Sequence, residues 1–299
     1  MNRIKEEIRD SFKKGTTLTK LIYINLGAFV LIWIPLTLLK LFNVSAEWST
    51  ILQLPAGLSR FIYTPWTILT YMFFHLNFIP LIINILILYW FGKLFIRFFS
   101  QRDLVGLYLL GGIAGGIFFI IAYNLFPYFA PYIKGSYLLG ASASVLAVIV
   151  ATAVIAPNYP IRLALIAEFK LKWLAIGCVV ISFLNITTFQ DGQLTLTNPS
   201  GQIAHLGGAL MGYLFASQYK RGKNITSWIN LMLDKAVNLF RRKPRLKVTH
   251  QRPLTDQEYN FKKKQERENV DRILEKIKIG GYESLSKEEK EELFRASQK

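Results

Sequence analysis

The stretch Gly135–Ile161 reads GSYLLGASASVLAVIVATAVIAPNYPI and contains no charged residue in 27 positions. A helix that crosses the hydrocarbon core of a bilayer needs about 20 mostly apolar residues, so this stretch is long enough to span a membrane. Its beginning is different in character, because Gly140-Ala-Ser142-Ala-Ser144 places two hydroxyl side chains just before the apolar run. The stretch therefore predicts a membrane helix with polar groups at its start.

Five other uncharged stretches accompany it. They are Leu21–Leu39, Phe61–Gly92, Leu104–Ile133, Trp173–Gln190 and Gly192–Tyr219. The shortest is just sufficient to span a bilayer, and the longer ones leave residues for loops. We therefore count six transmembrane helices and predict an all-α integral membrane protein. The first twenty residues are polar and of mixed charge, so we expect no cleavable signal peptide there.

The composition of the chain excludes several classes of protein. Of its 299 residues, 52% are hydrophobic and 18% are charged, against about 25% charged in ordinary soluble domains. The apolar content excludes a disordered chain, and the single cysteine, Cys178, excludes a disulfide-stapled module. A net charge of +17 could indicate a nucleic-acid-binding protein. However, 21 of the 36 Lys and Arg residues lie in residues 219–299, beyond the apolar stretches, as in a membrane protein with a basic tail.

Basic residues between the stretches predict the orientation, because cytoplasmic loops carry an excess of Lys and Arg. Such residues are frequent in the first twenty positions and after the second and fourth stretches, and scarce in the other connections. We therefore expect both termini in the cytoplasm and the protein in the cell (inner) membrane. The cytoplasmic connections are identified by their basic residues, which are Lys93, Arg97, Arg102, Arg162, Lys170 and Lys172. The connections on the other side have only Arg60 and Lys134, and the segment around Asp191 has no basic residue.

Two apolar segments are interrupted by residues that break helices. Asn43–Thr64 contains Pro55 and Gly57, which favours a half-embedded loop at the membrane interface. Prolines and glycines also follow one another between Tyr123 and Gly140. Since non-helical backbone is tolerated in a membrane only where protein or water surrounds it, the helix after Gly140 is expected to begin at the floor of a water-filled cavity.

Of the three histidines, His75 and His205 lie in apolar stretches and His250 lies in the basic tail. Ionisable groups inside a membrane usually face the bundle interior or water, so His75 and His205 are the candidates for chemistry. Catalytic metal sites usually take three protein ligands, and two histidines without a buried carboxylate do not supply them. We expect no metal and no cofactor.

A serine nucleophile needs a nearby base and donors for the developing oxyanion. Ser142 lies at an expected helix start, where free N–H groups and the helix dipole favour negative charge. His205 precedes Gly208-x-x-x-Gly212, a spacing that allows close approach to a neighbouring helix. If that neighbour carries Ser142, the two side chains can meet. The alternative is that Ser142, His205 and the glycines serve packing only.

Four motifs resemble those of the rhomboid intramembrane serine proteases, in the family's order. Gly140-Ala-Ser142-Ala resembles the Gly-x-Ser-Gly motif, and Ala204–Gly212 resembles the last helix with its histidine and glycine ladder. Thr70–Gly92 looks like the second helix, and Leu107–Gly116 is similar to the third. The resemblance covers about residues 18–219. It implies the six-helix rhomboid fold, with Ser142 as nucleophile and His205 as general base in a dyad without a third acid.

Three departures from the family pattern concern activity. The second helix of the family usually reads His, four residues, His, three residues, Asn; here His75 and Asn84 are present, but Pro80 stands in the middle. Proline cannot donate to an oxyanion. The remaining donors are the Ser142 N–H and the Asn84 side chain, with His75 or a water in the third place; alternatively Pro80 kinks the helix and swings His75 inward. Milder departures are Ala143 after the serine and Leu146 where an aromatic residue often packs against the histidine.

Two functions follow from these residues. The first is an endopeptidase that cuts transmembrane segments of other proteins, near small or helix-breaking residues. The second is a rhomboid scaffold that binds transmembrane helices without cleaving them; retention of both Ser142 and His205 favours the first. A transporter needs a pathway of polar residues through the bundle, and the asparagines in the stretches are too few and too scattered for one.

The tail divides into a basic segment and a small helical appendage. Residues 220–250 combine Lys and Arg with apolar residues at helical spacing, which predicts an amphipathic helix on the anionic inner leaflet; nucleic-acid binding is the alternative. In residues 251–299, Thr255-x-x-Glu258 and Ser286-x-x-Glu289 fit capping boxes and Gly280-Gly281 fits a helix end. This hairpin resembles the appendage of Bacteroidetes-type rhomboids. We expect it to dock onto a partner or the membrane domain (residues 19–219, after a cytoplasmic segment 1–18) and to carry no chemistry.

Overall fold

The computed structural model describes residues 12, 15–44, 47–163, 167–186, 199–240 and 255–297. The chain divides into two units, Met1–Arg241 and Arg242–Lys299, each of which is described by itself. The expectations for residues 1–11, for the connection around Asp191, and for the basic residues and His250 between 241 and 250 lie outside the described residues.

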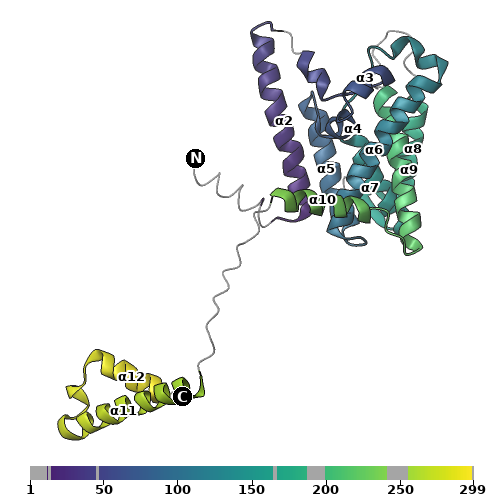
Figure 1. The fold of residues 1–299 in the computed structure, drawn as a ribbon. Coiled ribbons are helices and arrows are strands. Elements are labelled where there is room, and N and C mark those ends of the chain that lie inside the picture. Colours follow the sequence, from purple (N-terminus) through teal and green to yellow (C-terminus); the bar gives the residue numbers. More distant parts are fainter. Residues whose placement is uncertain are drawn as a thin grey trace. The chain divides into compact units, whose positions relative to one another are not determined.

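A helix of the first unit runs through each of the six apolar stretches (Figure 1). These helices are α2 (Thr17–Leu41), α5 (Phe78–Phe95), α6 (Gln101–Leu125), α7 (Ser142–Ile155), α8 (Leu171–Leu184) and α9 (Pro199–Lys220). Among the described residues, α2, α5 and α6 are long and apolar enough to cross a membrane, whereas α7 and α8 are shorter apolar helices of 14 residues each. The chain is therefore mostly helical, with several apolar helices.

The second stretch, Phe61–Gly92, is not one helix, contrary to the sequence reading of Thr70–Gly92. It begins inside the short α3 (Leu58–Tyr63), continues through α4 (Thr67–Thr70) and the 3-10 turn η2 (Tyr71–Phe73), and ends inside α5. The residue before a proline disfavours the helical conformation, and Thr64, before Pro65, ends α3. His75 accordingly lies in the connection before α5. Pro80 is the third residue of α5, and a proline in the first turn breaks no helical hydrogen bond, so it does not kink the helix.

The two interrupted segments meet each other. The loop after α2 contains η1 (Glu47–Ile51) and β1 (Leu54–Pro55), and the segment after α6 contains η3 (Pro127–Tyr132) and β2 (Tyr137–Leu138). β1 and β2 pair antiparallel, with Leu54 opposite Leu138, and the Ala56 N–H donates to the Ser136 carbonyl at 3.0 Å. This pairing anchors the chain just before Gly140. A second two-stranded sheet, the hairpin of β3 (Pro160–Leu163) with β4 (Ala167–Lys170), connects α7 to α8; the all-α prediction included neither sheet.

Helix α7 lies at the centre of the bundle. Its side chains from Ala143 to Ala153 are all buried, as expected for a helix that is apolar on every side. Helices α6 and α9 pack against it and against each other, and the Tyr123 hydroxyl of α6 lies 3.0 Å from the Ser200 hydroxyl of α9. Helices α2 and α8 are peripheral, with few buried side chains.

A further helix, α10 (Ser227–Phe240), lies across the end of the bundle where α6 begins (Figure 1). The turn before it is held by Asp103 in the first turn of α6: the carboxylate accepts hydrogen bonds from the Asn224 amide at 2.7 Å and the Thr226 hydroxyl at 2.8 Å. Arg102 also pairs with Asp234 of α10 at 3.3 Å. These contacts fix the start of α10 at the level of the N-terminus of α6.

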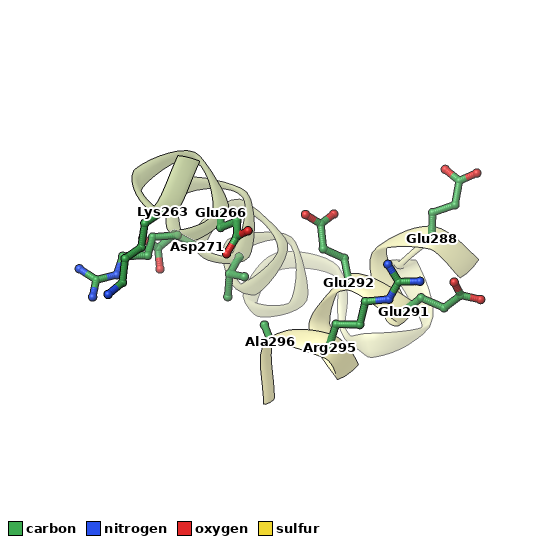
Figure 2. A pocket seen from close by; sticks show the side chains of 10 residues that line it. Lys263, Glu266, Asp271, Glu288, Glu291, Glu292, Arg295 and Ala296 are labelled. Carbon is green, nitrogen blue, oxygen red and sulfur yellow. The ribbon is translucent and has the colours of Figure 1, made fainter. Parts of the chain in front are cut away.

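The second unit is the predicted helical hairpin. It contains α11 (Asp256–Gly280), η4 (Tyr282–Ser284) and α12 (Lys287–Ser297). Both capping boxes are confirmed: Glu258 and Thr255 exchange hydrogen bonds, as do Glu289 and Ser286. Gly281 ends α11 with φ of +71°, a conformation that favours glycine. The groove between α11 and α12 is lined mostly by charged side chains of both signs (Figure 2).

Candidate active site

Ser142 is the first residue of α7, and the turn before it is built on a glycine. Gly140 has φ of +105°, where a side chain would be strained, and its N–H donates to the Tyr71 carbonyl at 2.9 Å. The first helical hydrogen bond runs from the Val145 N–H to the Ala141 carbonyl at 3.0 Å. Among the described residues, the N–H groups of 142–144 therefore have no hydrogen-bond acceptor. Together with the helix dipole, they suit an anion beside Ser142.

The two serines of the motif differ in accessibility. Ser142 is half-buried, although both neighbouring alanines are buried. Ser144 is completely buried, with its hydroxyl 3.9 Å from the Met72 sulfur, and a side chain at Gly112 of α6 would collide with it. Only Ser142 can therefore meet a substrate without rearrangement of the core.

Helix α9 reaches α7 through two glycines. A Cβ at Gly208 would lie less than 3.0 Å from the carbonyl oxygen of Ala143, and one at Gly212 would lie equally close to that of Ala147. Such distances leave no room for any side chain, so the two backbones are in direct contact. The helix that carries His205 thus lies against the first turn of the helix that carries Ser142.

His205 is half-buried, and its Nδ1 lies 3.0 Å from the hydroxyl oxygen of Ser182 in α8. Among the described residues, no hydrogen bond joins Ser142 to His205, and the Nε2 atom of His205 has no hydrogen-bond partner. Hydrogen bonds between catalytic groups are often long or absent before a substrate binds, so the lack of a Ser142–His205 hydrogen bond does not exclude the two residues as a dyad. Sequence reasoning missed Ser182, although a buried hydroxyl in an apolar stretch is a signal worth following.

His75 connects α5 to the start of α7. It is 2% exposed, and its Nε2 accepts a hydrogen bond from the Ala141 N–H at 3.3 Å while lying 3.2 Å from the amide nitrogen of Asn84. Because a backbone N–H can only donate, Nε2 carries the lone pair, which assigns the proton of the neutral ring to Nδ1. His75 therefore holds Asn84 beside the motif, and its Nε2 has no proton to give to an oxyanion in this arrangement.

The structure also gives the positions of the three residues that depart from the family pattern. Pro80 is exposed in the first turn of α5, four residues before Asn84 and hence on the same face of the helix. Leu146 and Ala143 are buried in α7. Within the described ranges, no group of three or more His, Cys, Asp or Glu side chains could hold a metal ion.

Comparisons with known proteins agree with this architecture. A family described as Rhomboid domain matches residues 63–221, and a family of unknown function, DUF6576, matches residues 255–299. RHOMBOID-like protein 12, mitochondrial, from Arabidopsis thaliana is 27% identical over 165 residues, which cover 52% of this chain and 47% of that protein. The chain thus spans about half the length of this curated relative, and no solved structure matches. Because the first match extends over more than half of the chain, and includes the Ser142 turn and the glycine contacts of α9, this protein belongs to the rhomboid family.

Proposed function

We propose that this protein is an intramembrane serine endopeptidase that hydrolyses peptide bonds in or near transmembrane segments of other membrane proteins. The observation that carries the proposal is the backbone contact of α9 with α7, which brings the helix of His205 to the turn of Ser142. The accessible Ser142 and the buried Ser144 support Ser142 as the nucleophile.

In the proposed reaction, Nε2 of His205 takes the proton of the Ser142 hydroxyl as the oxygen attacks the peptide carbonyl. The oxyanion accepts hydrogen bonds from the Ser142 N–H at the start of α7 and from the Asn84 amide. His205 then gives its proton to the leaving amine. Water hydrolyses the acyl-enzyme, with His205 again acting as the base, and restores the free serine. Substrates have small or helix-breaking residues near the cut, because a peptide bond inside a helix is not accessible to attack.

We further propose that the six apolar helices all cross the membrane, with both termini in the cytoplasm. Helices α7 and α8 have 14 residues each, so they are about 21 Å long against a hydrocarbon core of about 30 Å. A short α7 agrees with this proposal, because its buried side chains meet protein rather than lipid. It also agrees with a nucleophile that lies below the outer surface, in a cavity open to water.

Helix α10 and the basic residues around it suit the anionic inner leaflet. Trp228 is 52% exposed and Met232 is 61% exposed beside the bundle, while Lys220, Arg221 and Lys223 precede the helix. The test is a nitroxide attached to the thiol of a Met232→Cys variant in a Cys178→Ala background, reconstituted in vesicles with anionic or only zwitterionic lipid. Deeper burial of the label with anionic lipid is expected. Binding of RNA or DNA by the full chain instead supports the alternative partner.

A non-cleaving scaffold is the second candidate function. Pro80 supports it, because proline supplies no donor for the oxyanion at the position where the family usually has histidine. The amide nitrogen of Asn84, the remaining side-chain donor, already lies 3.2 Å from His75. A scaffold of this kind would bind transmembrane helices through the same bundle and release them intact.

Cleavage of a generic transmembrane substrate by the purified full chain decides between the two. The wild type and Ser142→Ala are incubated with the substrate in detergent and in proteoliposomes, and the products are identified by mass spectrometry. Cleavage that disappears in Ser142→Ala supports the protease. Binding of the substrate without cleavage by either protein supports the scaffold.

A further inference from the structure

The third side chain beside the dyad comes from α8. Ser182 is 4% exposed, and with Leu171 and Ala175 it is one of three buried side chains of this peripheral helix. These three positions follow helical spacing and form the stripe with which α8 faces the bundle. A buried hydroxyl is stable only with a hydrogen-bond partner, and the partner of Ser182 is Nδ1 of His205 at 3.0 Å.

We infer that Ser182 is a positioning residue that holds His205 in the tautomer a general base requires. The inference rests on the proposed function, because it assigns a role toward the Ser142–His205 dyad. A neutral imidazole has one proton, and only the nitrogen without it can accept the proton of the nucleophile. When Nδ1–H donates to Ser182 Oγ, the lone pair is on Nε2, which among the described residues has no partner.

The role of Ser182 corresponds to that of the carboxylate in a serine protease triad, without its charge. Neither α8 nor α9 contains an acidic residue, so no carboxylate on these two helices can orient the ring. Leu146 of α7 has no aromatic ring to stack on the imidazole. A hydroxyl on α8 therefore fixes the ring, and its hydrogen bond becomes stronger when His205 becomes positively charged during attack.

In the competing arrangement, the same hydrogen bond runs in the opposite direction. If the Ser182 hydroxyl donates to Nδ1, the proton of the ring lies on Nε2, and His205 cannot accept the proton of Ser142 through that atom. Ser182 would then be a packing residue that satisfies its own hydroxyl. The two arrangements have the same heavy-atom distance, so the tautomer of His205 distinguishes them.

The first arm of the test measures kinetics with a transmembrane substrate. We expect Ser182→Ala to lower kcat about tenfold with KM nearly unchanged, as for the loss of one hydrogen bond that acts in the transition state. Ser182→Thr keeps the hydroxyl and should recover most of the activity. Cys178→Ala, one turn earlier on the same side of α8, is the matched control and should retain wild-type turnover. A change in KM alone, or equal turnover of Ser182→Ala and wild type, overturns the inference.

The second arm of the test determines the tautomer of His205 and requires no cleavage. The full chain is labelled with ¹⁵N-histidine, His205 is assigned from the spectrum of His205→Gln, and the ring nitrogens are observed at a pH where His205 is neutral. The inference expects a proton on Nδ1 in the wild type and Ser182→Thr, and a mixture of tautomers in Ser182→Ala. A proton on Nε2 in the wild type overturns it. If the wild type cleaves no substrate, the proposed function fails, and this spectrum still decides the role of Ser182.

Discussion

Helices α7 and α9 of the first unit and helices α11 and α12 of the second differ in what lies between them. In the first pair, Gly208 and Gly212 bring two backbones into contact, and no side chain separates them. In the second pair, Lys276 of α11 reaches Glu289 of α12 at 2.9 Å, and Ile273 of α11 and Leu285, which precedes α12, are buried. A contact between backbones leaves two helices little freedom to shift, whereas long charged side chains adapt. Only the first arrangement suits a dyad whose members come from different helices.

The largest effect is expected in α7 and α9, at the two residues of the proposed dyad. Ser142→Ala and His205→Ala should each lower cleavage by at least about 10⁴-fold, because they remove the proposed nucleophile and the proposed base. Ser144→Ala is the control; its hydroxyl is buried against Met72, and activity should stay within a few fold of wild type. Retained cleavage in Ser142→Ala, measured on a transmembrane substrate, would mean that another residue is the nucleophile.

The contact between backbones can be tested by adding one methyl group. Gly208→Ala places a Cβ against the Ala143 carbonyl, and overpacking of this kind typically costs about 1–3 kcal/mol, occasionally more. We expect a lower unfolding temperature in detergent and a large loss of cleavage. Gly177→Ala in α8 is the matched control, since nothing lies within 4 Å of that position. It should be neutral or slightly stabilising, and equal unfolding temperatures for the two variants would disprove the close contact.

The two regions also differ in how much of their structure the sequence alone predicts. A helix runs through each of the six apolar stretches, and both capping boxes form where the local patterns predict them. The spacing of Gly208 and Gly212 predicts close approach to a neighbouring helix, but it does not identify α7 as that neighbour. The division of Phe61–Gly92 does not follow, because an uncharged apolar run looks the same whether it is helical or irregular. The catalytic roles of Ser142 and His205 stay predictions.

Contacts between distant segments were beyond sequence reasoning for a physical reason. Ser182 and His205 are 23 residues apart, and their hydrogen bond depends on how α8 packs onto the bundle. Likewise, His75 could be recognised as a polar residue in an apolar stretch, but its contact with the Ala141 N–H follows from the pairing of loops far apart in the chain. Neither contact has a periodic signal.

A smaller effect concerns the donors of the oxyanion. Asn84→Ala should lower kcat about 10²-fold, because it removes the side-chain donor that lies beside the motif. Pro80→His introduces a donor on the same face of α5 and should raise kcat by about tenfold, with little change in KM. Asn84→Ala should then be less harmful in the Pro80→His background. Lower turnover of Pro80→His than of wild type would show that the proline is required for the local structure.

The smallest effect is expected in the second pair, α11 and α12, at the capping box that begins α11. The N–H of Thr255 donates to the Glu258 carboxylate at 2.9 Å and holds the pKa of this carboxyl below its ordinary value. A carboxyl whose pKa is lowered by folding stabilises the helix start above its unfolded pKa, about 4.3, and that contribution is lost as the pH falls through the folded value. Protection of the Thr255 amide against hydrogen exchange in the full chain should therefore decrease as the pH falls below the unfolded pKa of about 4.3.

Glu258→Gln separates charge from hydrogen bonding at this position. A glutamine can still accept from the Thr255 N–H, so the capping box persists, but it has no proton to gain. After correction for the intrinsic pH dependence of exchange, the variant should show nearly constant protection of Thr255 from pH 7 to pH 3. Cleavage of a transmembrane substrate at neutral pH should be the same in both proteins, because the described residues of the hairpin include neither member of the dyad. Equal loss of protection in wild type and variant would instead place the acid-sensitive group outside the capping box, in the charged contacts between α11 and α12.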